Sequence, residues 1–120
     1  MVSNADCTIY VQQGATAIYA RFPISGVFWE DKREVGFSQS GAADLNGIRV
    51  FISIDRVSLP ELSASSQRRM YIVRGIVMEE VLDSAGLRHM IELRHPLTVT
   101  SVTKRDYGSQ GMQHWEVTAR

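Results

Sequence analysis

The sequence predicts a mainly β fold, a small antiparallel β-barrel or sandwich of six to seven strands with one short helix. Three observations lead to this prediction. Apolar side chains recur with a period of two in several short runs. One stretch instead has helical spacing and ends before a proline. The length of 120 residues suits one compact domain, so we expect residues 1–120 to form a single β-barrel domain.

Four strands are predicted in the first half of the chain, at residues 6–12, 16–22, 24–30 and 48–54. In the first of them, Cys7 and Ile9 face one way and Tyr10 faces the other. Pro23 separates the second run from the third, because proline cannot donate a hydrogen bond to a central ladder. The fourth run alternates most clearly, as a half-buried antiparallel strand does.

Three strands and the helix are predicted in the second half. The strands are at residues 70–78, 97–103 and 112–118, and the last two form a C-terminal hairpin. Gly75, inside the first of these runs, indicates a bulge or a tight bend. The helix begins at the capping residue Asp83 and ends before Pro96, which disfavours helical backbone at the residue before it.

Long polar loops are predicted at residues 31–47 and 58–69. Loops of more than about 12 residues in so small a domain are usually functional or disordered. Three basic doublets are also predicted to lie in loops: Lys32-Arg33, Arg68-Arg69 and Lys104-Arg105. If the three converged, they would form a sequence-independent contact with phosphates. Ordinary solvated loop charge is the simpler interpretation, because acidic residues lie close to them.

Composition restricts the classes of function. Thirteen Lys and Arg residues balance thirteen Asp and Glu residues, which argues against a surface wholly devoted to nucleic acid. No apolar run approaches the ~20 residues needed to span a bilayer, and the first residues lack a signal-peptide pattern. The single cysteine, Cys7, excludes an internal disulfide and fits a reducing cytoplasm. We expect no membrane and no small-molecule substrate as partners.

Motifs of the common enzyme and metal sites are missing from the sequence. It contains no phosphate-binding glycine loop, no nucleophile elbow and no paired-cysteine zinc motif. Glu92-x-x-His95 occurs once, whereas a di-iron site needs two such motifs. Glu79-Glu80 is interpreted as a solvated strand end and Cys7 as a small core residue. We therefore predict no catalytic residue, no metal and no cofactor, and a protein that is not an enzyme.

Four segments resemble short structural proteins of tailed bacteriophages with siphovirus-type tails. They are residues 4–10, 24–30, 71–77 and 100–117, and the last is the most specific because it holds DYGS followed by MQHWEV. Related members carry proline and histidine where this chain has Gln110 and Gly111, two positions in a predicted turn. The layout is also similar to that of the head-closure (head–tail joining, or stopper) proteins of the phage neck, which have a small β-barrel fold.

The resemblance implies a structural protein of the virion neck, assembled in the host cytoplasm. Such a protein forms a homo-oligomeric ring below the portal and adaptor, meets the tail-end proteins on its other side, and lets double-stranded DNA pass through its centre. Residues 31–47 would then face the channel, where Lys32 and Arg33 would make transient contact with DNA phosphates. The turn formed by Tyr107, Gly108 and Ser109 would contact an adjacent ring.

Two alternatives stay open. Minor capsid, decoration and tail-terminator proteins share small β folds and differ in their place in the virion. A small β-barrel nucleic-acid-binding module is the other alternative, and salt-dependent binding to DNA would distinguish it.

Overall fold

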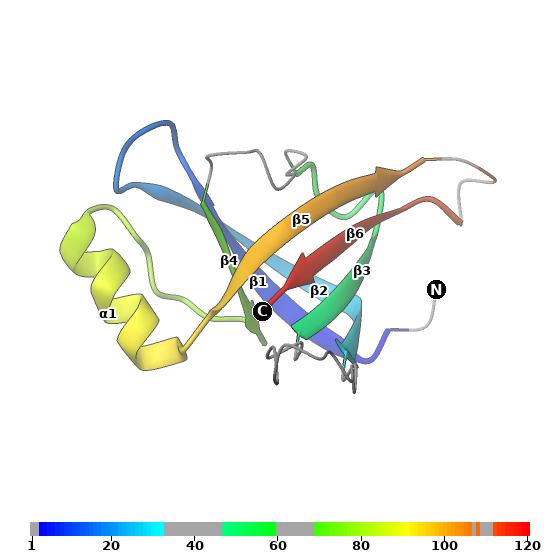
Figure 1. The fold of residues 1–120 in the computed structure, drawn as a ribbon, viewed down its shortest axis with the longest axis horizontal. Coiled ribbons are helices and arrows are strands. Elements are labelled where there is room, and N and C mark those ends of the chain that lie inside the picture. Colours follow the sequence, from blue (N-terminus) through cyan, green and yellow to red (C-terminus); the bar gives the residue numbers. More distant parts are fainter. Residues whose placement is uncertain (1–2, 33–46, 60–68, 107, 109–111) are drawn as a thin grey trace, which may run out of the picture.

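A closed barrel of six antiparallel strands forms the body of the protein in a computed structural model that describes residues 3–32, 47–59, 69–106, 108 and 112–120 (Figure 1). Around the barrel the strands follow the order β1-β2-β3-β6-β5-β4. The elements are β1 (Ala5–Gln12), β2 (Tyr19–Lys32), β3 (Gly47–Ser53), β4 (Met70–Arg74), α1 (Ser84–Arg94), β5 (Leu97–Arg105) and β6 (His114–Ala119). The predicted fold class, a mainly β barrel with one short helix, is confirmed.

Strand β1 is buried on both faces. Cys7, Ile9 and Val11 point into the barrel, as the alternation predicts. Thr8 and Tyr10 point to the outside of the barrel, yet both are fully buried. The outer face of β1 must therefore be covered by another part of the chain.

The prediction of two strands separated by Pro23 is wrong, because β2 runs without interruption through this proline. Tyr19 donates its backbone N–H away from β1, to Val81, so by the alternation of a strand the backbone of Pro23 also points away from β1. The missing N–H of Pro23 therefore costs no hydrogen bond between β1 and β2. On the other edge of β2, the proline prevents pairing with a further strand at this position. Further along, Gly26 has a φ of 76° beside a register shift opposite Ala5 and Cys7, and β2 bends there from β1 to β3.

Apolar side chains fill the barrel. Members of this first core come from all six strands, and the turn after β3 adds Leu59, with Val57 packed against the cluster. The Nε1–H of Trp115 donates to the carbonyl of Val57 at 3.0 Å, which fixes that turn to the core. Trp29 and Trp115 are both buried in this cluster. Both tryptophans thus stabilise the barrel from within.

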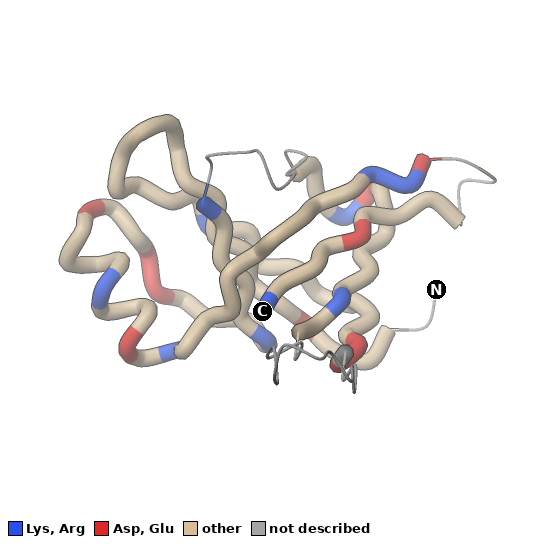
Figure 2. The backbone as a smooth tube through the Cα atoms, in the orientation of Figure 1, with Lys and Arg blue, Asp and Glu red and all other residues tan. Residues whose placement is uncertain are grey.

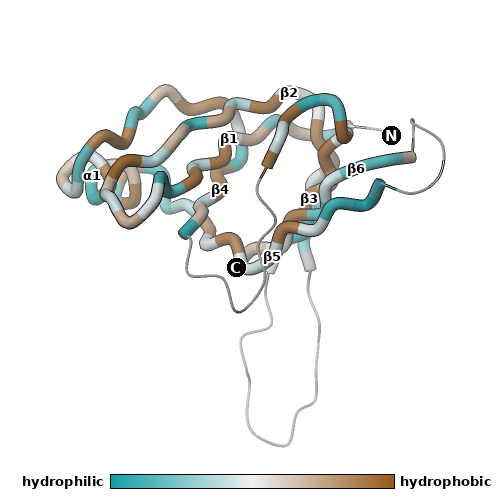
Figure 3. The backbone as a smooth tube through the Cα atoms, turned by 90° about the horizontal axis from the view of Figure 1, so that it is seen from above, coloured by the Kyte–Doolittle hydropathy of each residue, from teal (hydrophilic) through white to brown (hydrophobic). Residues whose placement is uncertain are grey.

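A second, smaller core lies on the outside of the barrel. It contains Tyr10 and Tyr19 from β1 and β2, Val73 from β4, Val77 and Val81 from the segment after β4, and Met90 from α1. In the view from above, α1 lies at one end of the molecule and the β5–β6 hairpin at the other (Figure 3). The helix and the segment before it thus supply the cover that the outer face of β1 requires.

The predicted helix is confirmed, with both of its ends. The side chain of Asp83 accepts a hydrogen bond from the backbone N–H of Gly86 at 2.7 Å, which satisfies one free donor of the first turn. His95 ends the helix in the left-handed conformation, with a φ of 48°, and its N–H donates to the carbonyl of Ile91. Pro96 explains this ending, because the residue before a proline is disfavoured in the right-handed helical region.

Two differences in strand boundaries change how neighbouring residues are interpreted. The strand predicted at 70–78 ends at Arg74, because Gly75 adopts a φ of 92° and directs the chain out of the barrel. The C-terminal hairpin is present, but β5 extends to Arg105. Lys104 and Arg105 therefore lie in a strand and not in a loop, which corrects the prediction for that doublet.

The predicted long loops lie mostly outside the described residues. Strand β2 continues to Lys32 and β3 begins at Gly47, so the ends of the loop predicted at 31–47 belong to strands. Residues 33–46 and residues 60–68, most of the second predicted loop, fall outside the described part of the chain.

Candidate functional site

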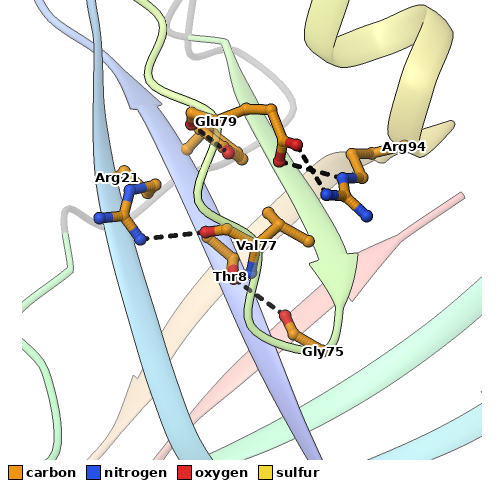
Figure 4. Close-up of polar contacts among 7 residues, drawn as sticks. Thr8, Arg21, Gly75, Val77, Glu79 and Arg94 are labelled. Carbon is orange, nitrogen blue, oxygen red and sulfur yellow. Dashed lines mark hydrogen bonds and ion pairs between the residues drawn. The ribbon is translucent and has the colours of Figure 1, made fainter.

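The segment that covers β1, residues 75–82, is the most unusual feature of the described structure, and we call it the strap. Side chains of the barrel hold its backbone (Figure 4). The hydroxyl of Thr8 donates to the carbonyl of Gly75 at 2.9 Å and accepts from the N–H of Val77 at 3.0 Å. Arg21 donates to the carbonyl of Val77 at 3.0 Å, and Tyr10 donates to that of Glu79 at 2.6 Å. The strap is thus attached mainly by side-chain hydrogen bonds.

An ion pair connects the strap to the helix. Arg94, in the last turn of α1, makes two hydrogen bonds to the carboxylate of Glu79, at 2.6 and 3.0 Å. The hydrogen bond from Arg94 is the main reason that the pKa of Glu79 lies below its ordinary value, and the same bond raises the pKa of Arg94. Burial, followed by the charge of Glu79, raises the pKa of Tyr10. Glu79 is therefore a structural connection between two segments, where the sequence indicated only a solvated strand end.

Exposed apolar side chains gather on the outer side of the strap. Ile76, Met78 and Leu82 are 43%, 70% and 64% exposed, and Ile18, next to the residue that pairs with Val81, is 44% exposed. Four of the six large apolar side chains that are exposed in the described structure belong to this group, which we call the apolar row. An exposed apolar cluster of this kind is typical of a surface that contacts another protein.

A shallow hollow of about 200 Å³ lies beside the apolar row, between β2 and the strap. Tyr19, Arg21, Glu80 and Leu82 line it. Strand β2 therefore contributes an aromatic ring and a cation to the hollow, and the strap contributes an anion and an apolar side chain.

The opposite side of the barrel has a different character. Phe28, Phe51 and His114 stack in sequence across β2, β3 and β6, with ring centroids 6.0 and 5.4 Å apart. Beside them, Glu116 lies between Arg49, at 3.3 Å, and Arg105, at 3.4 Å. The aromatic side chains of this face are only partly exposed, so it is a weaker candidate for a contact surface than the apolar row.

Lys32 and Gly108, the two sequence-predicted site residues that the structure describes, fall at opposite ends of the barrel. Lys32 ends β2 beside Gly47, and Arg33 lies outside the described residues. Gly108 lies beyond the other end, after β5, and its φ of 89° agrees with the expected glycine turn; Tyr107 and Ser109 lie outside the described residues. The two candidate contacts are thus not brought together.

The described members of the basic doublets do not all converge either; Arg33 and Arg68 lie outside the described residues. Arg69 precedes β4, and Lys104 and Arg105 end β5, at the end of the barrel away from Lys32 (Figure 2). Lys104 lies over the ring of Trp115, and Arg105 pairs with Glu116. Both of these cations therefore have partners within the barrel wall.

The remaining titratable residues have structural surroundings. Burial, followed by the charge of Asp6, raises the pKa of the Cys7 thiol to about 12, so this cysteine is the small core residue that the sequence indicated. Among the described residues, no group of three or more His, Cys, Asp or Glu side chains could hold a metal ion. No helix in the described part of the chain is long and apolar enough to cross a membrane.

The strap is the candidate site that sequence reasoning missed. The sequence predicts one strand over residues 70–78, whereas the chain leaves the barrel after Arg74, in the middle of that range. The available signal was the alternation of Ile76, Met78 and Leu82 with Val77 and Val81 on the far side of Gly75.

Residues 2–120 match a family of unknown function, DUF6751. The chain belongs to this family. The DUF6751 match covers both the barrel and the strap with its helix. No curated protein and no solved structure matches this DUF6751 chain.

Proposed function

We propose that this protein is a structural subunit of the head-to-tail connector of a tailed bacteriophage. In this proposal it forms a ring of identical subunits below the portal and adaptor proteins, joins the head to the tail, and lets DNA pass through the centre. The proposal rests on the resemblance of residues 4–10, 24–30, 71–77 and 100–117 to phage structural proteins. A small closed barrel agrees with the fold that this resemblance implies.

The observation that carries the proposal is the separation of the two candidate contacts. The connection between β2 and β3, residues 33–46, leaves one end of the barrel, and the β5–β6 turn leaves the other. A connector ring must contact one neighbour toward the head and a different neighbour toward the tail. A barrel with long connections at opposite ends can make both contacts at once, with Lys32 and Arg33 toward the channel and the Tyr107–Gly108–Ser109 turn toward an adjacent ring.

The apolar row supports an assembly role in a second way. In a ring, two different surfaces of neighbouring subunits contact each other. Apolar side chains that are exposed in the single subunit often form such interfaces. The filled barrel interior also fits a subunit that surrounds DNA together with its neighbours, because no passage runs through the barrel itself.

Electron microscopy of phage particles that carry the labelled full-length protein tests the proposal. We expect label in a ring on the tail axis, directly below the portal. Label spread over the capsid lattice would instead indicate a minor capsid or decoration protein, and label at the top of the tail tube a tail terminator. Particles without label would overturn a structural role and favour the nucleic-acid-binding alternative.

The DNA contact has its own test. Particles that carry Lys32→Ala together with Arg33→Ala should retain packaged DNA less well, or eject it at a changed rate, because two phosphate contacts are lost. Arg69→Ala is the matched control, since this exposed arginine lies at the other end of the barrel. Normal retention and ejection in the double variant would refute the channel assignment while leaving the ring intact.

A further inference from the structure

The strap has two chemically distinct sides. Its exposure alternates from residue to residue between Ile76 and Leu82, which is the period of an extended strand. The side chains of Val77 and Val81 are buried, and the backbone groups of residues 75, 77, 79 and 81 bond to the barrel. The even-numbered side chains point to solvent.

The backbone on the outer side of the strap is unpaired. None of the hydrogen bonds made by the described residues involves a backbone group of Ile76, Met78 or Glu80. Backbone N–H and C=O groups in an extended, solvent-facing segment can pair with a further strand. This free edge lies along the apolar row, so a segment bound there can make backbone hydrogen bonds and apolar contacts at the same time.

The size of the apolar row indicates what it can bind. A stable dimer buries about 800 Å² on each partner, from some 20 to 30 residues. Three exposed side chains of the strap, with Ile18 before β2, are far fewer than such a dimer needs. They match one added strand, which gains affinity from backbone pairing and specificity from alternate side chains.

The charge around the apolar row defines the partner further. Residues 75–95 hold four carboxylates and two guanidinium groups (Figure 2). Glu79 is already paired with Arg94, and Asp83 caps α1, whereas Glu80 is exposed at the end of the apolar row and makes no ion pair within the described structure. A cation on the partner would complement Glu80.

A second copy of this chain does not supply the missing strand from its described part. All six of its strands are already paired within the barrel, and Pro23 blunts the exposed stretch of β2. A second copy offers only its own strap, and two such short apolar rows bury far less surface than a stable dimer needs, so the occupant is a segment of a different protein.

We propose that the strap accepts an extended segment of a partner protein as an additional strand. This segment pairs with the backbone of Ile76 and Met78, since the carbonyl of Glu80 lies against Gly86 in the first turn of α1. It places apolar side chains at alternate positions against the apolar row, and a lysine or arginine beside Glu80. The proposal does not depend on the partner being a phage protein, so it stands or falls separately from the proposed function.

Binding of a defined peptide to the full-length protein tests this inference. The probe is a fluorescent synthetic peptide in which valine alternates with threonine between terminal lysines, and anisotropy reports its binding. Met78→Glu should weaken binding at least about tenfold, because it puts a charge in the middle of the apolar row. Met112→Glu is the matched control: Met112 is 68% exposed against 70% for Met78, but it lies in the β5–β6 connection, and its substitution should leave binding unchanged.

Two further changes, one in the peptide and one in the protein, distinguish strand pairing from non-specific apolar binding. N-methylation of alternate residues of the peptide should abolish binding if backbone pairing is required. Glu80→Lys should weaken the lysine-flanked peptide and strengthen one flanked by glutamates. The inference is overturned by the absence of any binding, by equal losses for Met78→Glu and Met112→Glu, or by full binding of the N-methylated peptide. It is also overturned if Met78→Glu removes only self-association of the protein, since the occupant would then be a second copy.

Discussion

Thr8 is the residue on which attachment of the strap depends most. Its hydroxyl makes two hydrogen bonds at a fully buried position, as donor to Gly75 and as acceptor from Val77. No water can replace these bonds at a site with no exposure. A threonine in an alternating strand would ordinarily face solvent, and here the strap converts that position into a polar anchor.

The variant Thr8→Val tests this anchor. It keeps the shape of the side chain but leaves the N–H of Val77 and the carbonyl of Gly75 without their partner, at an expected cost of about 2 kcal/mol in the free energy of unfolding. Thr8→Ser keeps the hydroxyl and loses one methyl group, about 1 kcal/mol. Urea unfolding measures both. A Thr8→Val protein as stable as the wild type would mean that the hydroxyl contributes nothing.

At the scale of elements, α1 owes its beginning to one side chain. Asp83 bonds the N–H of Gly86, and Gly86 itself weakens the first turn by its conformational freedom. Asp83→Ala should therefore destabilise the protein by about 1 kcal/mol, whereas Asp83→Asn should stay close to wild type, because asparagine caps as well. Thermal unfolding followed by circular dichroism compares them. Equal stability of the alanine and asparagine variants would contradict the capping role.

The Glu79–Arg94 ion pair should make attachment of the helix depend on pH. The folded protein lowers the pKa of Glu79 below the unfolded value near 4.5, so the contribution of the pair is fully present above that value. It is lost as the pH falls through the folded pKa, when the carboxylate takes up a proton. We expect amide protection of α1 to decrease in this acid range in the wild type.

Glu79→Gln is the control for this pH effect. The variant should show weaker protection of α1 at neutral pH and should lack the additional loss in acid. Arg88→Gln, on the same helix but in none of its ion pairs, should behave like the wild type. If the wild type and Glu79→Gln lost protection in parallel as the pH fell, another carboxylate would control the helix.

The sequence allows the elements to be predicted where local chemistry decides them. Alternation located β1 and β3, and a capping aspartate with a following proline located both ends of α1. Pro23 misled the prediction because its effect depends on which side of β2 carries a neighbour, and this is a property of the whole barrel. Strand β4 ends because Gly75 adopts a positive φ. A glycine with a positive φ also occurs in bulges inside a strand, so the sequence alone does not show that the strand ends there.

The candidate site was less predictable than the fold. The strap is recognised by the partners of its backbone, namely Thr8, Tyr10 and Arg21, which lie more than 50 residues away in the sequence. Nothing in the local pattern around residues 75–82 indicates that these three side chains meet there. The exposed apolar row becomes meaningful only once the buried side of the strap is known.

At the scale of the molecule, β1 joins the two cores. Ile9 belongs to the barrel core and Tyr10, the next residue, to the core beneath the strap and α1. Any displacement of β1 disturbs both clusters at once. The two cores should therefore unfold together, although one is inside the barrel and the other outside it.

Two optical signals can separate the cores in an unfolding experiment. Trp29 and Trp115 both lie in the barrel core, so tryptophan fluorescence reports the barrel, whereas circular dichroism at helical wavelengths reports α1. We expect the two urea transitions to coincide. Met90→Ala, in the outer core, should shift both transitions by the same amount, about 3 kcal/mol, because Met90 is fully buried. Leu93→Ala, half-exposed on the same helix, should change stability by less than about 0.5 kcal/mol. If Met90→Ala moved the helical signal alone, the strap and α1 would be a separately unfolding unit, and the shared strand β1 would not couple the two cores.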